Sequence, residues 1–266
     1  MKRMWMLCSL ATLAGLAMAP GSLCAQTDDD EADELLAEGL PLTPGRMLSE
    51  TFTEGSWISL DVSPDGESLV FDLLGDLYTM PFTGGVATVL TQGMAFDGQP
   101  RFSPDGRTVV FVSDRSGGDG VWTISVDLAD TVRITRGDNS AYQSPEWTPD
   151  GDYIVATKQS PGQGKLWMYH RRGGGGVQLI EEPENARTTG AAFGGDERYI
   201  WHARRTGTWV YNSPGADYQL WVYDRDTGES NSRSGRYGGA VRPTLSPDGR
   251  WLAYAGRHLS ETGLRL

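Results

Sequence analysis

Short apolar runs alternate with turn sequences along most of the chain. Five of these runs are rich in β-branched and aromatic residues, and they begin at Ser68, Thr108, Tyr153, Tyr199 and Trp251. Residues of these types favour β-strands. The pattern therefore predicts a chain of many short strands and few long helices.

A recurring four-residue turn precedes each of these runs. It begins at Ser63, Ser103, Thr148 and Ser246 and reads Ser/Thr-Pro-Asp-Gly, with a degenerate copy that begins at Gly194. Proline fixes φ near −65° at the second position of a type I turn, and glycine takes the positive φ that follows. We therefore expect the aspartates of these copies to build turns and not to carry out chemistry.

Each unit continues in the same order after its first apolar run. A second run carries Leu or Val followed by an aromatic residue, which is Tyr78, Trp122, Trp167 or Trp221. A weaker run follows, and a last one leads into the next turn. The turns lie 40, 45, 46 and 52 residues apart, which divides the chain into units of residues 53–92, 93–138, 139–184, 185–238 and 239–266.

Four strands repeated at this period predict an all-β fold, a β-propeller of four-stranded blades. A β-sandwich would not require one fixed order of turn, strand, aromatic strand and strand. We expect about four complete blades and a truncated fifth. Trp122 lies 19 residues after Ser103, and the same step from Ser246 reaches Arg265, one residue before the last one. Because an unfinished blade exposes strand edges, the pattern predicts the N-terminal part of a longer protein.

The N-terminal residues have the pattern of an export signal. Lys2 and Arg3 precede an apolar run that is shorter than a membrane span, and residues 1–25 form the expected signal peptide. Residues 26–52 contain an acidic run and are expected to be a disordered leader. We therefore expect a periplasmic or secreted protein without stable membrane insertion after signal removal.

The remaining chemistry of the chain argues against several classes of site. A net charge of −12 disfavours nucleic acid as a partner. His170, His202 and His258 are isolated from one another, and Gly173–Gly176 lacks the lysine of a phosphate-binding loop. The chain also lacks the Gly-x-Ser-x-Gly motif of serine hydrolases. We expect no catalytic residue, metal ligand or cofactor in this segment.

The repeats resemble a known family. Segments such as "FSPDG", "FVSDRSGG" and "VWTI" are similar to the TolB-type, WD-repeat-like β-propeller from about Gly55 onward. The first two units resemble the N-terminal propeller of exported bacterial amidohydrolases. That resemblance implies hydrolysis of amide or related bonds, with a metal ion held only by a downstream domain that this sequence does not include.

Candidate contact residues follow from the geometry of propellers. Residues just before the innermost strand of a blade line the mouth of the central channel, and here they include Asp97, Gln99, Tyr142, Gln143, Arg187 and Arg242. The connection Arg204–Gln219 in the fourth unit is long and carries three aromatic residues: Trp209, Tyr211 and Tyr218. Long loops on a rigid scaffold often form recognition sites, but this one could also only cover a neighbouring blade or another domain.

Three functions fit these features. The first is a non-catalytic binding or domain-packing module of a longer metal-dependent amidohydrolase. The second is a stand-alone TolB-like periplasmic interaction protein, and the third is the propeller of a prolyl-oligopeptidase-like serine peptidase. The expected partner is a downstream domain of the same chain or another exported protein.

Overall fold

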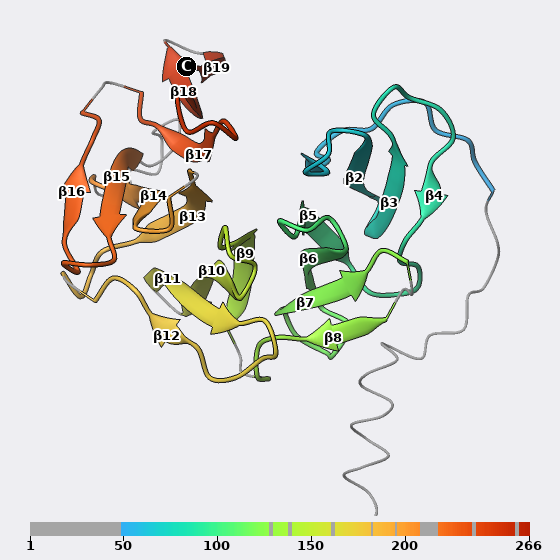
Figure 1. The fold of residues 1–266 in the computed structure, drawn as a ribbon, viewed down its shortest axis with the longest axis horizontal. Coiled ribbons are helices and arrows are strands. Elements are labelled where there is room, and N and C mark those ends of the chain that lie inside the picture. The colour runs from blue at the N-terminus through green and yellow to red at the C-terminus, as the bar shows by residue number, and fades with distance from the viewer. Residues whose placement is uncertain are drawn as a thin grey trace, which may run out of the picture.

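A computed structural model of the protein describes residues 49–266 except 128–129, 138–139, 161–162, 182, 195, 208–217, 236–237 and 259–260. These residues form five antiparallel sheets arranged as blades around a common centre (Figure 1). Four blades have four strands and the fifth has three, which confirms the predicted all-β propeller. The described residues include no helix that is long and apolar enough to cross a membrane.

The first two blades have the strand order expected from the repeat. Blade 1 comprises β1 (Leu60–Val62), β2 (Ser68–Leu73), β3 (Asp76–Pro81) and β4 (Thr88–Val89). Blade 2 comprises β5 (Asp97–Phe102), β6 (Thr108–Ser113), β7 (Gly120–Ser125) and β8 (Thr131–Arg133).

The other three blades follow the same plan. Blade 3 comprises β9 (Ala141–Trp147), β10 (Tyr153–Ser160), β11 (Gln163–His170) and β12 (Val177–Gln178). Blade 4 comprises β13 (Thr188–Phe193), β14 (Tyr199–Arg205), β15 (Tyr218–Asp224) and β16 (Ser230–Ser232). Blade 5 comprises β17 (Val241–Leu245), β18 (Leu252–His258) and β19 (Glu261–Arg265).

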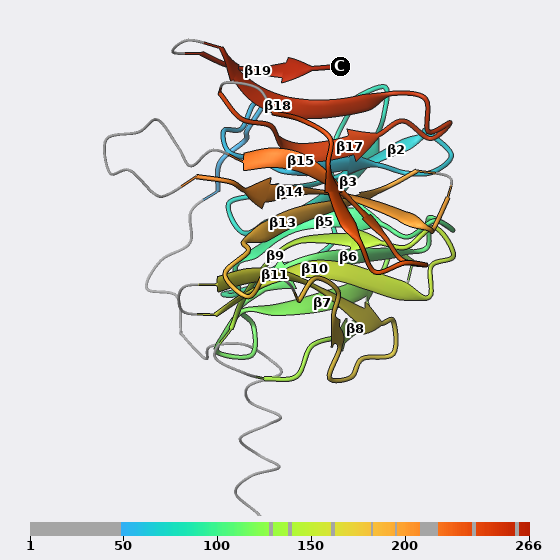
Figure 2. The ribbon, with the colours of Figure 1, turned by 90° about the vertical axis from the view of Figure 1, so that its left-hand side faces the viewer.

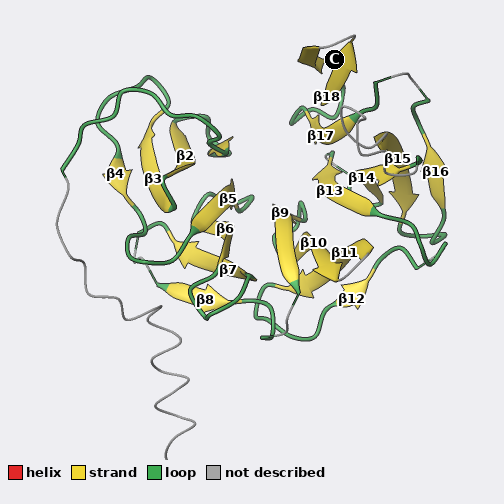
Figure 3. Ribbon diagram, turned by 180° about the vertical axis from the view of Figure 1, so that it is seen from behind, coloured by secondary structure: helices red, strands yellow, loops and turns green. Residues whose placement is uncertain are grey.

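The first strand of each blade is the innermost one. Figure 3 shows β5, β9 and β13 nearest the centre, with β4, β8, β12 and β16 at the periphery. The innermost strands contact one another in sequence, from β1 to β5, β9, β13 and β17. The strands of all blades run roughly side by side (Figure 2), so their connections collect at two opposite ends of the propeller.

We call these two ends the turn face and the loop face. The turn face carries the four Ser/Thr-Pro-Asp-Gly copies, which are Ser63–Gly66, Ser103–Gly106, Thr148–Gly151 and Ser246–Gly249. The loop face carries the connections between the second and third strands of each blade. Because each strand of a blade runs from one face to the other, the same strands support both faces.

The apolar core lies between neighbouring blades. Val70 and Leu77 of blade 1 are fully buried in one cluster with Phe111 of blade 2. Similar clusters fill the interfaces of blades 2 and 3 and of blades 3 and 4. A four-stranded blade has two faces to bury, and stacking neighbours against it supplies apolar partners for both.

Strand register shows that the aromatic positions are equivalent. Tyr78 pairs with Phe71, Trp122 with Phe111, Trp167 with Ala156 and Trp221 with His202, each across the second and third strands of one blade. In blade 5 the same register pairs Tyr254 with Arg265. The step of 19 residues from Ser246 therefore identified the equivalent position correctly.

The turn face repeats one hydrogen-bond network four times. In the second copy, the Ser103 hydroxyl donates to Asp105 Oδ1 at 2.6 Å, and the Arg107 N–H donates to the same oxygen at 3.1 Å. The Gly106 N–H donates to the Ser103 carbonyl at 2.8 Å, with the glycine at a φ of 71°. Equivalent bonds in the other three copies confirm that their aspartates build turns. The Ser103 hydroxyl bond lowers the pKa of Asp105.

Candidate functional site

The innermost strands of blades 2 to 5 share a β-bulge near the loop face. Each pairing with the second strand of its blade shows a register shift at this point. Four residues before each turn copy, the backbone has a positive φ, at Gln99 (57°), Ser144 (50°), Gly190 (66°) and Arg242 (53°). A bulge re-aims the neighbouring side chains, and positive φ is strained for residues other than glycine. The loop-face ends of β5, β9 and β17 are therefore locally strained, whereas β13 adopts the same conformation with a glycine.

The bulged backbone is held by the preceding blade. The Gln99 N–H donates to Asp72 Oδ2 at 2.8 Å, and the Ser144 N–H donates to Gln99 Oε1 at 2.6 Å. The Gly190 N–H donates to Thr157 Oγ1 at 3.3 Å. The Gln99 side chain, predicted to line the channel mouth, thus binds the next blade through its amide oxygen.

Two other predicted residues lie inside blade interfaces. Asp97 is only 2% exposed, and its Oδ2 accepts a hydrogen bond from Arg115 Nη2 at 2.6 Å. Burial, followed by the nearby Asp97 charge, raises the pKa of Asp76. Tyr142 is buried in the core, where its ring contacts Tyr169 edge-on. Arg242, in contrast, is exposed on the bulge of β17.

Three predicted residues come together between blades 3 and 4. Gln143, Arg187 and Tyr218 line a cavity of about 230 Å³ on the loop face. We call this cavity the polar cleft, and its other lining residues are Thr157, Gln159, Ser160, Gln163, Gly164, Thr188 and Thr189. Trp209 and Tyr211, the remaining candidates from the long connection, lie outside the described residues.

Hydrogen bonds between the blades fix the floor of the polar cleft. Gln143 Nε2 donates to Thr189 Oγ1 at 3.0 Å, and Thr157 Oγ1 lies 3.3 Å from the same hydroxyl. The Leu166 N–H donates to Thr188 Oγ1 at 3.0 Å. Because Thr157 and Thr188 are each only 1% exposed, this network is part of the interior and positions Gln143 before any ligand arrives.

The polar cleft has a distinct charge. Arg187 is half-buried, and within the described part of the chain its guanidinium has no ion pair. None of the described residues that line the cleft carries a carboxylate. The cleft therefore offers one positive charge among amides and hydroxyls, in a chain whose net charge is −12.

Sequence reasoning missed the half of the cleft formed by β10 and β11. In the sequence, Thr157 and Gln159 follow the apolar part of β10 and Gln163 begins β11, and all three look like ordinary exposed residues. One signal for the bulge was present, since the degenerate fourth unit carries Gly190 at the position that needs a positive φ. The equivalent residues Ser144 and Gln99 have the same positive φ, but their residue types do not indicate it in the sequence.

The inner strands hold a second group of polar side chains. Arg101 Nε lies 3.4 Å from Glu146 Oε2, and Asp61 Oδ2 accepts the Phe102 N–H at 2.8 Å. Asp61, Arg101 and Glu146 occupy the same position of the repeat, two residues before the turn, on β1, β5 and β9. Burial raises the pKa of Glu146 to about 7, against the opposing effect of Arg101.

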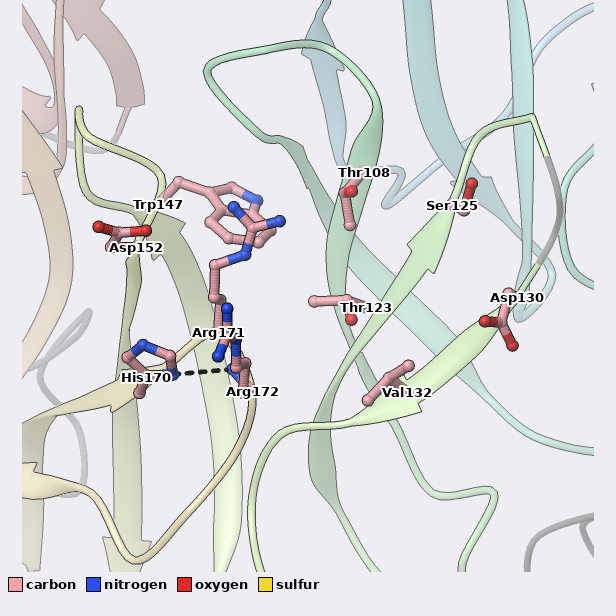
Figure 4. A pocket seen from close by; sticks show the side chains of 10 residues that line it. All are labelled: Thr108, Thr123, Ser125, Asp130, Val132, Trp147, Asp152, His170, Arg171 and Arg172. Carbon is pink, nitrogen blue, oxygen red and sulfur yellow. Dashed lines mark hydrogen bonds between the residues drawn. The ribbon is translucent and has the colours of Figure 1, made fainter.

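A larger hollow of about 590 Å³ lies between blades 2 and 3 toward the turn face. Figure 4 shows His170, Arg171 and Arg172 on one wall and Thr123, Asp130 and Val132 on the other. The Arg172 N–H donates to His170 Nδ1 at 3.1 Å. Both arginines are exposed, and so are Asp130 and Asp152. No group of three His, Cys, Asp or Glu that could hold a metal ion occurs among the described residues.

Residues 46–191 match the TolB beta propeller domain (PD40). An uncharacterized protein of Agrobacterium fabrum is 34% identical over 145 residues, which cover 51% of this chain and 47% of that protein. The uncharacterized peptidase YuxL of Bacillus subtilis is 29% identical over 181 residues, which cover 68% of this chain and 24% of the peptidase.

Two further similarities come from a third relative and a solved structure. Tricorn protease homolog 1 of Streptomyces coelicolor is 27% identical over 174 residues, which cover 62% of this chain and 16% of that protein. The structure of a putative TolB from Agrobacterium tumefaciens has a TM-score of 0.63 at 18% identity, covering 75% of this chain and 69% of that one.

These comparisons support the TolB-type part of the expected resemblance and do not single out amidohydrolases. The chain spans about half or less of the length of the curated relatives described above. The match covers more than half of the chain and contains the first three turn copies. Repeat, fold and sequence match agree, and the chain belongs to the TolB β-propeller family.

Proposed function

We propose that the chain is the recognition propeller of a peptidase-type hydrolase, and that its polar cleft contacts peptides. The observation that carries this proposal is the cleft itself. It is built across two blades, it has a hydrogen-bonded floor under Gln143, and it opens on the face where the long connection begins. Amides, hydroxyls and one arginine are suited to peptide backbone, which presents N–H and C=O groups.

The named relatives favour a peptidase over the amidohydrolase expected from the first two units. Two of the three are a peptidase and a protease homolog by name, and the chain matches only 24% and 16% of their lengths. In this proposal the rest of such a protein would supply the catalytic groups. The propeller would select or orient the substrate.

The coding sequence beyond Leu266 tests this proposal directly. We expect a Gly-x-Ser-x-Gly motif followed by a histidine, as a serine peptidase requires. A His-x-His motif would instead support the amidohydrolase. Purified full-length protein should then hydrolyse a peptide library, and Gln143→Ala should raise KM more than it lowers kcat. An unchanged KM would argue against a role of the cleft in substrate binding.

A stand-alone TolB-like interaction protein is the second candidate. The specific observation in its favour is that this chain covers 69% of the putative TolB structure, far more than its share of the peptidases. Further propeller repeats and no catalytic motif after Leu266 would support it. Its partner would then be another exported protein.

We also propose that the protein is exported. Residues 1–25 support this proposal through their two basic residues and following apolar run. Mass spectrometry of the protein purified from the source cells should find a new N-terminus near Gln26. An intact Met1 in cytoplasmic extract would contradict export. We assign no cofactor to this segment.

A further inference from the structure

We infer that the polar cleft binds a free carboxylate, and specifically the C-terminal carboxylate of a peptide. That the ligand is a peptide rests on the proposed function, whereas the carboxylate follows from the residues of the cleft alone. The residue that binds this carboxylate is Arg187.

Charge selects the ligand group. Arg187 is the one cationic residue among the described residues that line the cleft, and no carboxylate lines it with them. A guanidinium presents a planar set of donors that matches a carboxylate with two parallel hydrogen bonds. Half-burial removes part of the water that would otherwise compete for these donors. An anionic group is therefore the natural partner of this side chain.

The hydrogen-bonding groups of the cleft indicate what kind of molecule carries the carboxylate. Gln143 uses its Nε2 to bind Thr189 Oγ1 at 3.0 Å, and this bond turns the amide so that Oε1 remains as an acceptor. Gln159 and Gln163 add two exposed amides that no described residue binds. An acceptor and two amides beside a guanidinium fit the last peptide N–H and C=O groups of a chain that ends in a carboxylate.

Size limits how much of the ligand enters. Ligand sites for drug-sized molecules have volumes of roughly 300–1,000 Å³. The polar cleft measures about 230 Å³, so it can hold one or two terminal residues. The remainder of a peptide would leave across the loop face. This arrangement recognises the C-terminal end of a peptide and places no requirement on the internal sequence of that peptide.

The hollow of Figure 4 provides the contrast within the molecule. Its two arginines are exposed and share their surroundings with Asp130 and Asp152. These two carboxylates would repel an anionic ligand in the hollow. Arg172 is therefore a matched control for Arg187, since it is an exposed arginine in the wall of a hollow that also contains aspartates.

The test compares two peptides that differ only in the terminal group. Isothermal titration of the whole chain would use N-acetyl-Ala-Ala-Ala and its C-terminal amide. We expect the free acid to bind at least about tenfold more tightly, because the amide cannot form the charge-assisted pair. Arg187→Gln should abolish this difference, Arg187→Lys should keep part of it, and Arg172→Gln should leave it unchanged.

Several results would overturn the inference. They are equal affinity for the two peptides, no binding of either, or a preference that survives Arg187→Gln. Thermal unfolding of each variant shows whether the fold is intact, and the Lys variant keeps the test valid if the Gln variant does not fold. A full-length protein that hydrolyses peptides without preferring free acids would refute only the inference. A chain that binds free acids but belongs to no peptidase would refute only the proposed function.

Discussion

The turn face and the loop face are made by the same five blades, but they differ in what recurs. On the turn face the hydrogen bond from the Ser or Thr hydroxyl to the Asp carboxylate returns in four copies, at 2.5 to 2.6 Å. On the loop face the bulge recurs in backbone, while its residues are Gln99, Ser144, Gly190 and Arg242.

This difference separates positions where the backbone limits the residue type from positions where the residue type can vary between blades. A turn that joins two strands tightly has the same residues in four of the five blades, because few residue types satisfy its backbone angles. A bulge whose N–H is bound by the preceding blade can carry different side chains at a cost in strain. Departures from the repeat at accessible positions are therefore the places to look for recognition.

The largest predicted effect on stability concerns a buried position at which the fourth unit departs from the repeat. His202 occupies the position of Phe71 and Phe111, is fully buried, and has its pKa lowered to about 4 by burial. Its pKa in the unfolded chain is near 6.5, so the unfolded state binds the proton first. Stability should then fall as the pH drops from 6.5 toward 4.

Replacing His202 by Phe should remove this dependence. We expect the variant to gain about 2 kcal/mol relative to the natural protein between pH 8 and pH 5, measured by urea unfolding at both values. Tripeptide binding should not change, because His202 lies outside the polar cleft. A parallel pH dependence of the two proteins would show that the histidine is not buried in its neutral form.

The second prediction removes one recurring turn residue. Asp105→Ala deletes the acceptor of the Ser103 hydroxyl and the Arg107 N–H, and should cost about 1–2 kcal/mol of unfolding free energy. Asp127→Ala, at an exposed aspartate, is the control. Because the folded pKa of Asp105 is lowered by the Ser103 bond, the difference should persist above about pH 4 and shrink below it. A difference unchanged at pH 2.5 would contradict this account.

The third prediction exchanges residues between equivalent bulges. Gly190→Ser should destabilise the protein by roughly 1 kcal/mol, since serine at a φ of 66° is strained. Ser144→Gly should change the unfolding free energy by less, because relief of strain offsets the larger entropy of the unfolded chain. If both substitutions were neutral, the bulge strain would be negligible.

The smallest predicted effect on stability is at the proposed recognition residue. Arg187→Gln should change the unfolding free energy by less than about 0.5 kcal/mol, as expected for a residue that forms no ion pair with any residue that the structure describes. It should nevertheless remove selectivity for the free acid. A loss of stability as large as that of Asp105→Ala would place Arg187 with the structural residues and undo the contrast between the two faces.

Much of the fold could be predicted from the sequence because its determinants are local. The turn copies, the β-branched runs and the aromatic position each depend on residues that are close in the chain, and five repetitions average out local ambiguity. The step from Ser103 to Trp122 even located Arg265 opposite Tyr254 in the last blade.

The candidate site was predictable only in part. Gln143 and Arg187 were expected at the channel mouth and Tyr218 in the long connection. Asp97 and Tyr142 were also expected at the channel mouth, but the structure buries them between blades. Whether a side chain near a bulge points into an interface or out of it depends on the register shift and on the blade beside it. Neither is encoded in the residues next to that side chain.

The sequence by itself determined the repeat, its turns and the order of strands, since these follow from backbone preferences over a few residues. Tertiary structure alone decided that two blades would build a hydrogen-bonded floor from Gln143 and Thr189, which lie 46 residues apart. It also placed Arg187 in the same cleft, where the described lining residues include no carboxylate. Contacts between blades are long-range in sequence, and only packing brings their side chains together.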